Sequence, residues 1–235
     1  MIGIIGAMQT EVELLIGNIE NKKIENISGI AFVSGKLSGA DVVVAKCGIG
    51  KVFAALCAQT MILKYGVELI INTGVGGAID ESLDIGDVAV SDFVVQHDMD
   101  TTALGDPIGL ISGINVVRIE ADKGTANELL DVAEGSGVHA VLGTVASGDK
   151  FISGAEAKKR IRDTFGAAVC EMEGAAIGQV CYVNEVPFCV IRAVSDKADG
   201  TSGVDYMTFV DSAAKKNASI VLSYLARKNN CIVFL

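Results

Sequence analysis

The stretch that decides the fold is VELIINTGVGGAI, residues 67–79, in which an apolar run ends in a cluster of glycines. Residues 67–72 have the length and the branched side chains of a β-strand, and a run this apolar is typical of a strand buried on both faces. Ligands of open α/β sheets bind at the carboxyl ends of strands, where glycine lets the backbone approach a ligand closely. The stretch therefore predicts a central strand that leads into a ligand-binding cleft.

Strand-like and helical segments alternate on both sides of this stretch. Short runs rich in valine and isoleucine predict strands at 2–5, 30–36, 41–46, 87–95, 138–146 and 187–195. Apolar residues at three- and four-residue spacing predict helices at 10–19, 51–63, 121–133, 154–163, 173–183 and 206–226. Residues 37–40 are short enough for a hairpin, whereas the later strands have helical crossovers. The pattern predicts one α/β domain over residues 1–235, with helices covering a mixed sheet.

The composition indicates which classes of molecule the protein can bind. Half of the 235 residues are hydrophobic, and 19 lysines and arginines against 29 aspartates and glutamates leave a formal charge of -10. Such a surface repels nucleic acid and anionic membranes, whereas a small neutral or zwitterionic substrate is compatible with it. No signal peptide and no apolar stretch of membrane-spanning length is recognisable, which predicts a cytoplasmic protein. We expect buried free thiols, typical of a reducing compartment, at Cys47, Cys57, Cys170, Cys181, Cys189 and Cys231.

Several common motifs fail at specific positions. Residues 74–79 open like a dinucleotide fingerprint, but Ile79 occupies the position of its third glycine. Residues 48–51 resemble a phosphate loop, yet Ala45 replaces its first glycine and Val52 its magnesium-binding hydroxyl. The two histidines form no HExxH motif or Cys/His cluster, and no segment matches GxSxG. We therefore expect no metal, no cofactor and no serine nucleophile.

Three carboxylates follow strand-like segments, at Glu11, Glu173 and Asp196. Each alone could cap a helix, because a carboxylate in the first turn accepts free amide hydrogens and interacts favourably with the helix dipole. Three of them at the ligand-binding edge of one sheet are more than capping requires. Glycosidic hydrolysis needs such groups: one acid protonates the leaving group, and a second carboxylate activates water. Spacing does not assign which acid has which role.

The order and spacing of several separated motifs resemble those of bacterial 5′-methylthioadenosine/S-adenosylhomocysteine nucleosidases over nearly the whole chain. The motifs are Gly3-Ile4-Ile5-Gly6-Ala7-Met8 with Glu11, Gly48-Ile49-Gly50-Lys51-Val52, Asn72-Thr73-Gly74 with Gly76-Gly77, Ser147-Gly148-Asp149 with Phe151-Ile152, Glu171-Met172-Glu173, and Arg192-Ala193-Val194-Ser195-Asp196. The resemblance implies a nucleoside phosphorylase-like fold, a three-layer α/β/α unit with a mixed central β-sheet. It also implies a homodimer with both active sites near the interface.

The resemblance also implies a role for each polar site residue. Asp196 would protonate the imidazole side of adenine, with Ser195 holding its carboxyl group. Glu11 would orient and deprotonate the attacking water, and Arg192 would help to fix that water. Glu173 would hold the ribose hydroxyls. These roles agree with the acid and base that glycosidic hydrolysis requires.

The apolar part of the site follows from the same resemblance. Phe151 would stack on the purine, and the backbone of Ile152 would read the edge of the base. The remaining contacts are expected around the ribose and the 5′ substituent, at Met8, Ile49, Met172, Tyr206 and Phe209. By residue type alone, Phe151 is as compatible with core packing as with ligand contact, whereas Met8, Ile49 and Met172 are of types that more often pack in a core than contact a ligand.

Three positions depart from the pattern of the family. Tyr206 stands where phenylalanine is more common, which bears on the preferred 5′ group. Val75 stands where many members carry serine near the ribose. Leu104 stands where the partner subunit of many members contributes an aromatic ring. None of the three changes an acid of the site.

The favoured function is hydrolysis of 5′-methylthioadenosine and S-adenosylhomocysteine, with 5′-deoxyadenosine as a further candidate substrate. A phosphorolytic enzyme of the same fold would need arginines to clamp phosphate. The chain has five arginines, of which Arg192 alone lies in a matched motif. Two further functions are compatible with the sequence: hydrolysis of a different nucleoside, such as futalosine, and nucleoside binding without catalysis. A water-activating base would have no purpose in a protein that only binds.

Overall fold

The computed structural model describes residues 1–198 and 202–232, and its described strands form one ten-stranded mixed sheet. The strands are β1 (Ile2–Gly6), β2 (Glu20–Ile27), β3 (Ile30–Leu37), β4 (Ala40–Lys46), β5 (Leu69–Ala78), β6 (Val88–Gln96), β7 (Ile119–Glu120), β8 (Ala140–Ser147), β9 (Ala167–Glu171) and β10 (Phe188–Asp196). The helices are α1 (Gln9–Asn18), α2 (Lys51–Tyr65), the short η1 (Thr102–Leu104), α3 (Lys123–Gly135), α4 (Ala155–Phe165), α5 (Gly174–Val183) and α6 (Ser202–Ile232).

The sheet has an open part and a closed part. In the open part β4, β1, β5 and β10 run parallel, and β3 and β2 extend the β4 edge as antiparallel strands. In the closed part β6 pairs antiparallel with β10, β8 and β9 follow in parallel, and β9 returns antiparallel to the end of β5. Because Gly77 of β5 pairs with Cys170 of β9, the last residues of β9 lie beside the last residues of β5.

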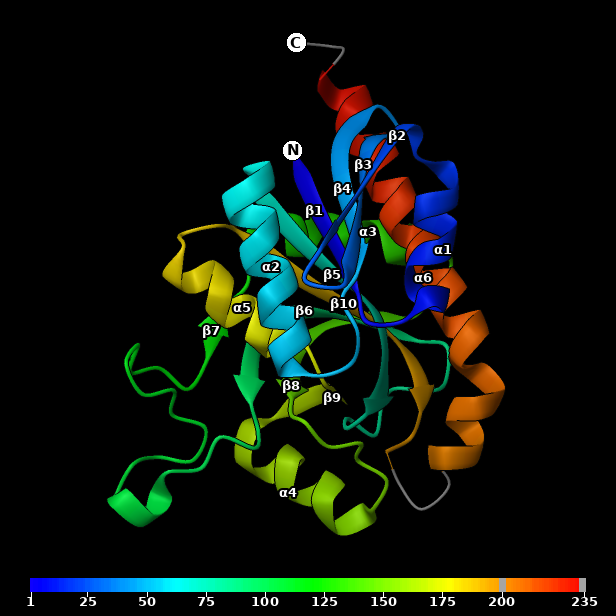
Figure 1. The fold of residues 1–235 in the computed structure, drawn as a ribbon. Coiled ribbons are helices and arrows are strands. Elements are labelled where there is room, and N and C mark those ends of the chain that lie inside the picture. The colour runs from blue at the N-terminus through cyan, green and yellow to red at the C-terminus, as the bar shows by residue number, and fades with distance from the viewer. Residues whose placement is uncertain (199–201, 233–235) are drawn as a thin grey trace.

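Helices cover both faces of the sheet, which gives the three-layer α/β/α arrangement (Figure 1). Successive residues of β4 alternate between two cores, because side chains in a strand point to opposite faces in turn. Val43 packs in the core that holds α2 and α5, whereas Val42 and Val44 pack in the core that holds α1, α3 and α6. A third, smaller core lies under α4. The predicted fold class is confirmed.

Each predicted strand and helix is present, but three strands were not predicted. The segment that forms β2 is charged and largely exposed at the edge of the sheet, so it shows no apolar alternation. β7 has two residues, and β9 is a five-residue buried strand that the sequence pattern did not separate from its surroundings. Such short elements acquire their structure from neighbouring strands rather than from their own pattern.

The central strand is longer than predicted. β5 continues past residue 72 to Ala78, so the glycines predicted to follow the strand lie inside it. The physical reason is space for two carboxylates. A Cβ at Gly74 would stand 2.5 Å from Oε1 of Glu11, and a Cβ at Gly77 would stand 2.9 Å from Oδ1 of Asp196. Glycine at these positions therefore lets both acids pack against the strand.

Two further predictions concern cysteines and membranes. The five cysteines whose side chains the structure describes are buried and free, as predicted, whereas the Cys231 side chain lies outside the described residues. Burial raises the pKa of each of these five thiols, so they remain protonated packing residues. Within residues 1–198 and 202–232, no helix combines the length and the apolar character needed to cross a membrane.

Candidate active site

A cavity of about 300 Å³ opens where the ends of β1, β5, β9 and β10 meet. The turn after β1 and the loop that precedes α4 complete its walls. All predicted site residues line this cavity except Arg192 and Phe209. Glu11, Glu173 and Asp196 thus share one cavity although they are far apart in the sequence. The closed part of the sheet is responsible, because it brings the end of β9 back to the end of β5.

Glu11 is held by three backbone amides. Its position in the first turn of α1 directs the side chain back over the β1 turn, where Oε2 accepts hydrogen bonds from the amides of Ala7 at 2.7 Å and Met8 at 2.9 Å. Oε1 accepts one from the amide of Val75 at 3.0 Å. Burial raises the pKa of Glu11, while the Arg192 charge and these amides act in the opposite direction. A fixed carboxyl group with a raised pKa is suited to accept a proton from water.

Asp196 is the last residue of β10 and is 2% exposed. Its Oδ2 accepts a hydrogen bond from the Ser195 hydroxyl at 3.0 Å, and its Oδ1 accepts one from the amide of Ala198 at 2.9 Å. These two contacts come from residues close in sequence and help to orient the carboxyl group. The Ser195 hydroxyl therefore contacts the carboxyl group that it was expected to hold.

Glu173 occupies the N-cap position of α5, where its side chain makes no capping hydrogen bond, and it is also buried. Its Oε1 accepts a hydrogen bond from the amide of Gly50 at 2.8 Å. Gly50 has a φ of 101°, a conformation that favours glycine. The segment that resembled a phosphate loop therefore presents an amide to a carboxylate of the site. Burial, followed by the nearby charge of Glu171, raises the pKa of Glu173, and Arg192 opposes that shift.

The opposite wall of the cavity is aromatic. The rings of Phe151 and Tyr206 meet edge to face, with centroids 5.5 Å apart and an interplanar angle of 77°. The Tyr206 hydroxyl donates a hydrogen bond to the Met8 sulfur at 3.0 Å. Burial and the three nearby acids raise the pKa of Tyr206, so its hydroxyl stays neutral. Phe151 is 44% exposed and lines the cavity, which leaves ring surface available for stacking.

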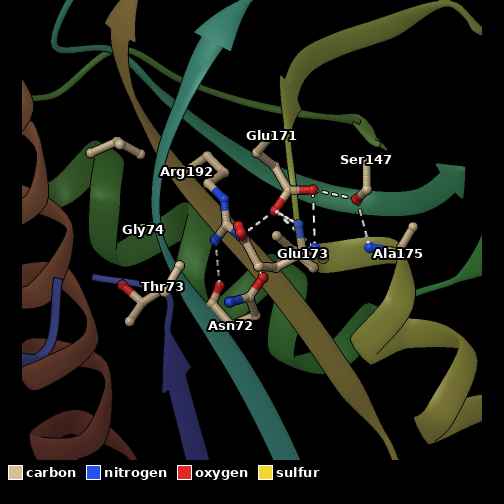
Figure 2. A network of polar contacts seen from close by, with 12 residues as sticks. Asn72, Thr73, Gly74, Ser147, Glu171, Glu173, Ala175 and Arg192 are labelled. Atoms are coloured by element: carbon tan, nitrogen blue, oxygen red, sulfur yellow. Dashed lines mark hydrogen bonds and ion pairs between the residues drawn. The ribbon is translucent and has the colours of Figure 1, made fainter. Parts of the chain in front are cut away.

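Arg192 and Phe209 do not line the cavity. Arg192 is buried behind the wall, where its guanidinium donates to Asn72 and Glu171 (Figure 2). Phe209 lies on α6 three residues after Tyr206, a spacing that rotates it by about 60° about the helix axis. Its side chain is 37% exposed. The structure therefore does not bring Phe209 to the predicted site.

Two charged residues that line the cavity were not among the predicted site residues. Lys150 lies in the loop before Phe151, and a single loop lysine carries no signal in the sequence. Glu171 lines the cavity at the end of β9. Its signal was present, because it is the first acid of the matched segment Glu171-Met172-Glu173, but its side chain was given no role. Its contacts are the densest polar network of the site (Figure 2).

Known proteins are similar to this chain in sequence and in fold. The family model described as the phosphorylase superfamily matches residues 1–226. A 5′-methylthioadenosine/S-adenosylhomocysteine nucleosidase of Shewanella halifaxensis is 42% identical over 225 residues, covering 95% of this chain and 98% of the relative. The structure of the Neisseria meningitidis nucleosidase in complex with methylthio-immucillin-A has a TM-score of 0.92 at 34% identity, and 96% of this chain and 98% of that chain are covered.

The structure of a futalosine hydrolase from Helicobacter pylori is also similar, with a TM-score of 0.91 at 32% identity and 97% of each chain covered. The fold is thus shared by hydrolases of different nucleosides. Sequence identity places the chain in a narrower group than the fold does. Curated 5′-methylthioadenosine/S-adenosylhomocysteine nucleosidases are about two-fifths identical to it over nearly its whole length. The chain belongs to the 5′-methylthioadenosine/S-adenosylhomocysteine nucleosidases of the phosphorylase superfamily, enzymes that hydrolyse an N-glycosidic bond.

Proposed function

We propose that this protein hydrolyses the N-glycosidic bond of 5′-methylthioadenosine and S-adenosylhomocysteine, and of 5′-deoxyadenosine, releasing adenine and the corresponding ribose product. The observation that carries the proposal is that Glu11 and Asp196 face one cavity, each held by backbone amides. Support comes from the relatives, which bear the name of this activity. Such a reaction serves methionine salvage, because it removes the nucleoside by-products of S-adenosylmethionine chemistry.

The proposed reaction begins at the leaving group. Asp196, as the carboxylic acid, gives its proton to the imidazole side of adenine while the bond between the base and ribose C1′ breaks. The bonding electrons leave with the purine, which departs as neutral adenine. Phe151 stacks on the base, and the backbone of Ile152 reads its edge. Ser195 and the amide of Ala198 keep the Asp196 carboxyl group oriented for this transfer.

The proposed reaction ends with water. The ribose carries cationic character at C1′, which the nearby Glu11 and Glu173 stabilise electrostatically. Glu11 takes a proton from the water while the water oxygen bonds to C1′. Glu173 accepts hydrogen bonds from the ribose hydroxyls. Exchange with solvent then removes the proton from Glu11 and returns one to Asp196.

The choice among substrates depends on the 5′ side of the cavity. Met8, Ile49, Met172 and Tyr206 give this region thioether and flat hydrophobic surface, which suits an apolar 5′-thio group. The Tyr206 hydroxyl is the polar exception in this wall. We therefore favour methylthioadenosine over futalosine as substrate. At Val75 the backbone amide contacts Glu11, so the missing serine hydroxyl is not needed to hold this acid.

The test is a set of specificity constants for methylthioadenosine, adenosylhomocysteine, 5′-deoxyadenosine and futalosine, measured in phosphate-free buffer. We expect adenine and free sugar from the first three, with no change in rate or product when phosphate is added. Ribose 1-phosphate as the product would instead identify a phosphorylase. A preference for futalosine would overturn the substrate assignment, and binding without turnover of any substrate would overturn catalysis.

We further propose that the protein works as a homodimer in the cytoplasm. Exposed apolar side chains follow one face of α2 and the end of α5, at Val52, Phe53, Leu56, Leu63, Tyr182 and Val183. A contiguous apolar face of this kind is typical of an interface between copies. The face borders the active site through Ile49, which is 57% exposed and lines the cavity. Leu104, 82% exposed, is the candidate contribution to the partner's site.

We predict that Leu56→Asp converts the dimer to a monomer, because it places a charge in the centre of this apolar face. Sedimentation equilibrium measures the change in mass. The matched control is Ile24→Asp, which puts the same charge on the exposed edge strand β2, where Ile24 is 63% exposed, and we expect it to remain dimeric. A parent protein that sediments as a monomer, or a Leu56→Asp variant that remains dimeric, would contradict the proposed interface.

A further inference from the structure

Glu171 lies at the centre of a buried polar network that includes Ser147, Arg192 and the backbone amide of Glu173 (Figure 2). Its side chain is 3% exposed. Oε1 accepts from the amide of Gly174 at 3.0 Å, and Oε2 accepts from the same amide at 2.8 Å and from the amide of Glu173 at 3.1 Å. The Ser147 hydroxyl accepts a hydrogen bond from the amide of Ala175 at 2.7 Å, so its own proton is donated to Glu171. Each of these groups donates a hydrogen bond to the Glu171 carboxylate.

The strongest of these donors is Arg192. Its guanidinium, on a side chain 2% exposed, donates to the backbone carbonyl oxygens of Asn72 and Ile191, each at 3.1 Å, to the side-chain oxygen of Asn72, and to Glu171. Among the described residues, Glu171 is the one carboxylate within ion-pair distance of this cation. Arg192 is therefore fixed by Glu171 on one side and by Asn72 on the other.

The Arg192 cation stands next to Glu11 and Glu173. Arg192 pairs in register with Gly74 of β5, over which the Glu11 carboxylate lies. Figure 2 shows Glu173 beside the Arg192 and Glu171 side chains. The positive charge lowers the pKa of both Glu11 and Glu173, whereas Glu171 raises that of Glu173. In a dry site these charges act strongly on each other.

We propose that Glu171 is a positioning residue of the nucleosidase reaction: it fixes where the Arg192 cation stands relative to Glu11 and Glu173, and it compensates part of that charge. The inference rests on the proposed hydrolase function. Glu171 does not act on substrate itself, because both of its oxygens are occupied by protein donors. It acts through Arg192 and through the turn that carries Glu173.

Glu171→Gln tests the proposal because it removes the charge and nearly keeps the shape. Arg192 then loses its counter-ion, and only its neutral partners Asn72 and Ile191 still hold it beside Glu11. We expect kcat/KM for methylthioadenosine to fall about 100-fold, the scale of a small misplacement of catalytic groups. We also expect the limb of the pH profile that reports Glu173 to move to lower pH, because the negative neighbour that raised its pKa is gone while Arg192 remains.

The other charged and titratable groups around this pair are unchanged in the variant. Glu11, Cys47 and Tyr206 face Glu173, and His97 and Cys170 face Glu171. Ser147→Ala is the matched control, since it removes a neutral donor to the same carboxylate and keeps every charge. Its pH profile should match that of the parent. Glu171→Asp keeps the charge on a shorter side chain, so it should lose rate but retain the pH profile of the parent.

The outcomes separate this inference from the function on which it rests. If the parent protein releases no adenine, the proposed function fails before Glu171 is considered. If the parent is active and Glu171→Gln keeps both its rate and its pH profile, Glu171 has no positioning role. If Glu171→Gln does not fold, Glu171→Asp decides: a parental rate, or a shifted pH profile, would overturn the proposal.

Discussion

Asp196→Asn is expected to lower kcat for methylthioadenosine by about 1,000-fold, within the range attributed to general acid catalysis. The asparagine keeps the size of the side chain and an oxygen that accepts from the Ala198 amide. It has no acidic proton to give to adenine, so the purine would have to leave as an anion. Initial rates of adenine release measure the loss. Because the packing against Gly77 is retained, we expect the thermal unfolding temperature to stay close to that of the parent.

The matched control removes a carboxylate near the site without removing the acid. Asp84→Asn takes the same charge from an exposed side chain that pairs with Lys197, next to Asp196 in sequence. Its kcat should equal that of the parent, because a solvated carboxylate contributes little to the field in the cavity. If Asp196→Asn turned over methylthioadenosine at the rate of the parent, Asp196 would not be the acid. A comparable loss in Asp84→Asn would point to net charge instead.

The layers of this fold were predictable because two patterns of apolar residues were visible in the sequence. Buried strands such as 41–46 are nearly continuous in apolar residues, and the covering helices repeat apolar positions every three or four residues. The closure of β6, β8 and β9 onto β5 was not predictable in the same way. It depends on pairs such as Gly77 with Cys170, which are 93 residues apart and leave no local pattern.

The candidate site was predictable where a residue is both chemically unusual and placed after a strand. Glu11, Glu173 and Asp196 met both conditions, and all three line the cavity. The carboxyl ends of parallel strands share one edge of a sheet, but β9 runs antiparallel to β5. Its end reaches the site because the two strands overlap only at their last residues.

The function of the buried polar residues was harder to predict. Asn72 and Ser147 lie within matched motifs, but their ordinary polar side chains indicate no particular role. Their importance depends on Arg192 and Glu171: Asn72 on β5 and Glu171 on β9 contact Arg192, and Ser147 on β8 contacts Glu171. Arg192 itself was placed near the water by resemblance, whereas the structure buries it behind the wall of the cavity. A network of this kind becomes visible only when the strands are paired.

Glu11→Gln should abolish hydrolysis while binding persists, with kcat for methylthioadenosine at least about 1,000-fold lower than in the parent. Glutamine does not accept a proton from water, so the attack on C1′ loses its base. Adenine release measures catalysis, and calorimetric titration with methylthioadenosine measures binding to the inactive variant. Glu13→Gln is the matched control, because Glu13 is exposed on the same helix and should tolerate the change. Loss of binding together with turnover would mean that Glu11 holds substrate rather than activating water.

The same variant separates catalysis from stability through pH. Two amides donate to Oε2 of Glu11 and the Val75 amide donates to Oε1, so one face of the glutamine amide must oppose a donor. A buried donor left unpaired costs about 1–3 kcal/mol in the free energy of unfolding.

In the parent, burial raises the pKa of Glu11 above its ordinary value of 4.5. The folded state therefore binds this proton more tightly than the unfolded chain, and Glu11 makes the parent less stable as pH rises from about 4.5 through the raised pKa. Glutamine does not titrate, so the stability deficit of Glu11→Gln should shrink over that range. Urea unfolding at several pH values measures it, and a deficit that grows with pH would mean that the amide contacts outweigh burial and that the pKa of Glu11 is lowered.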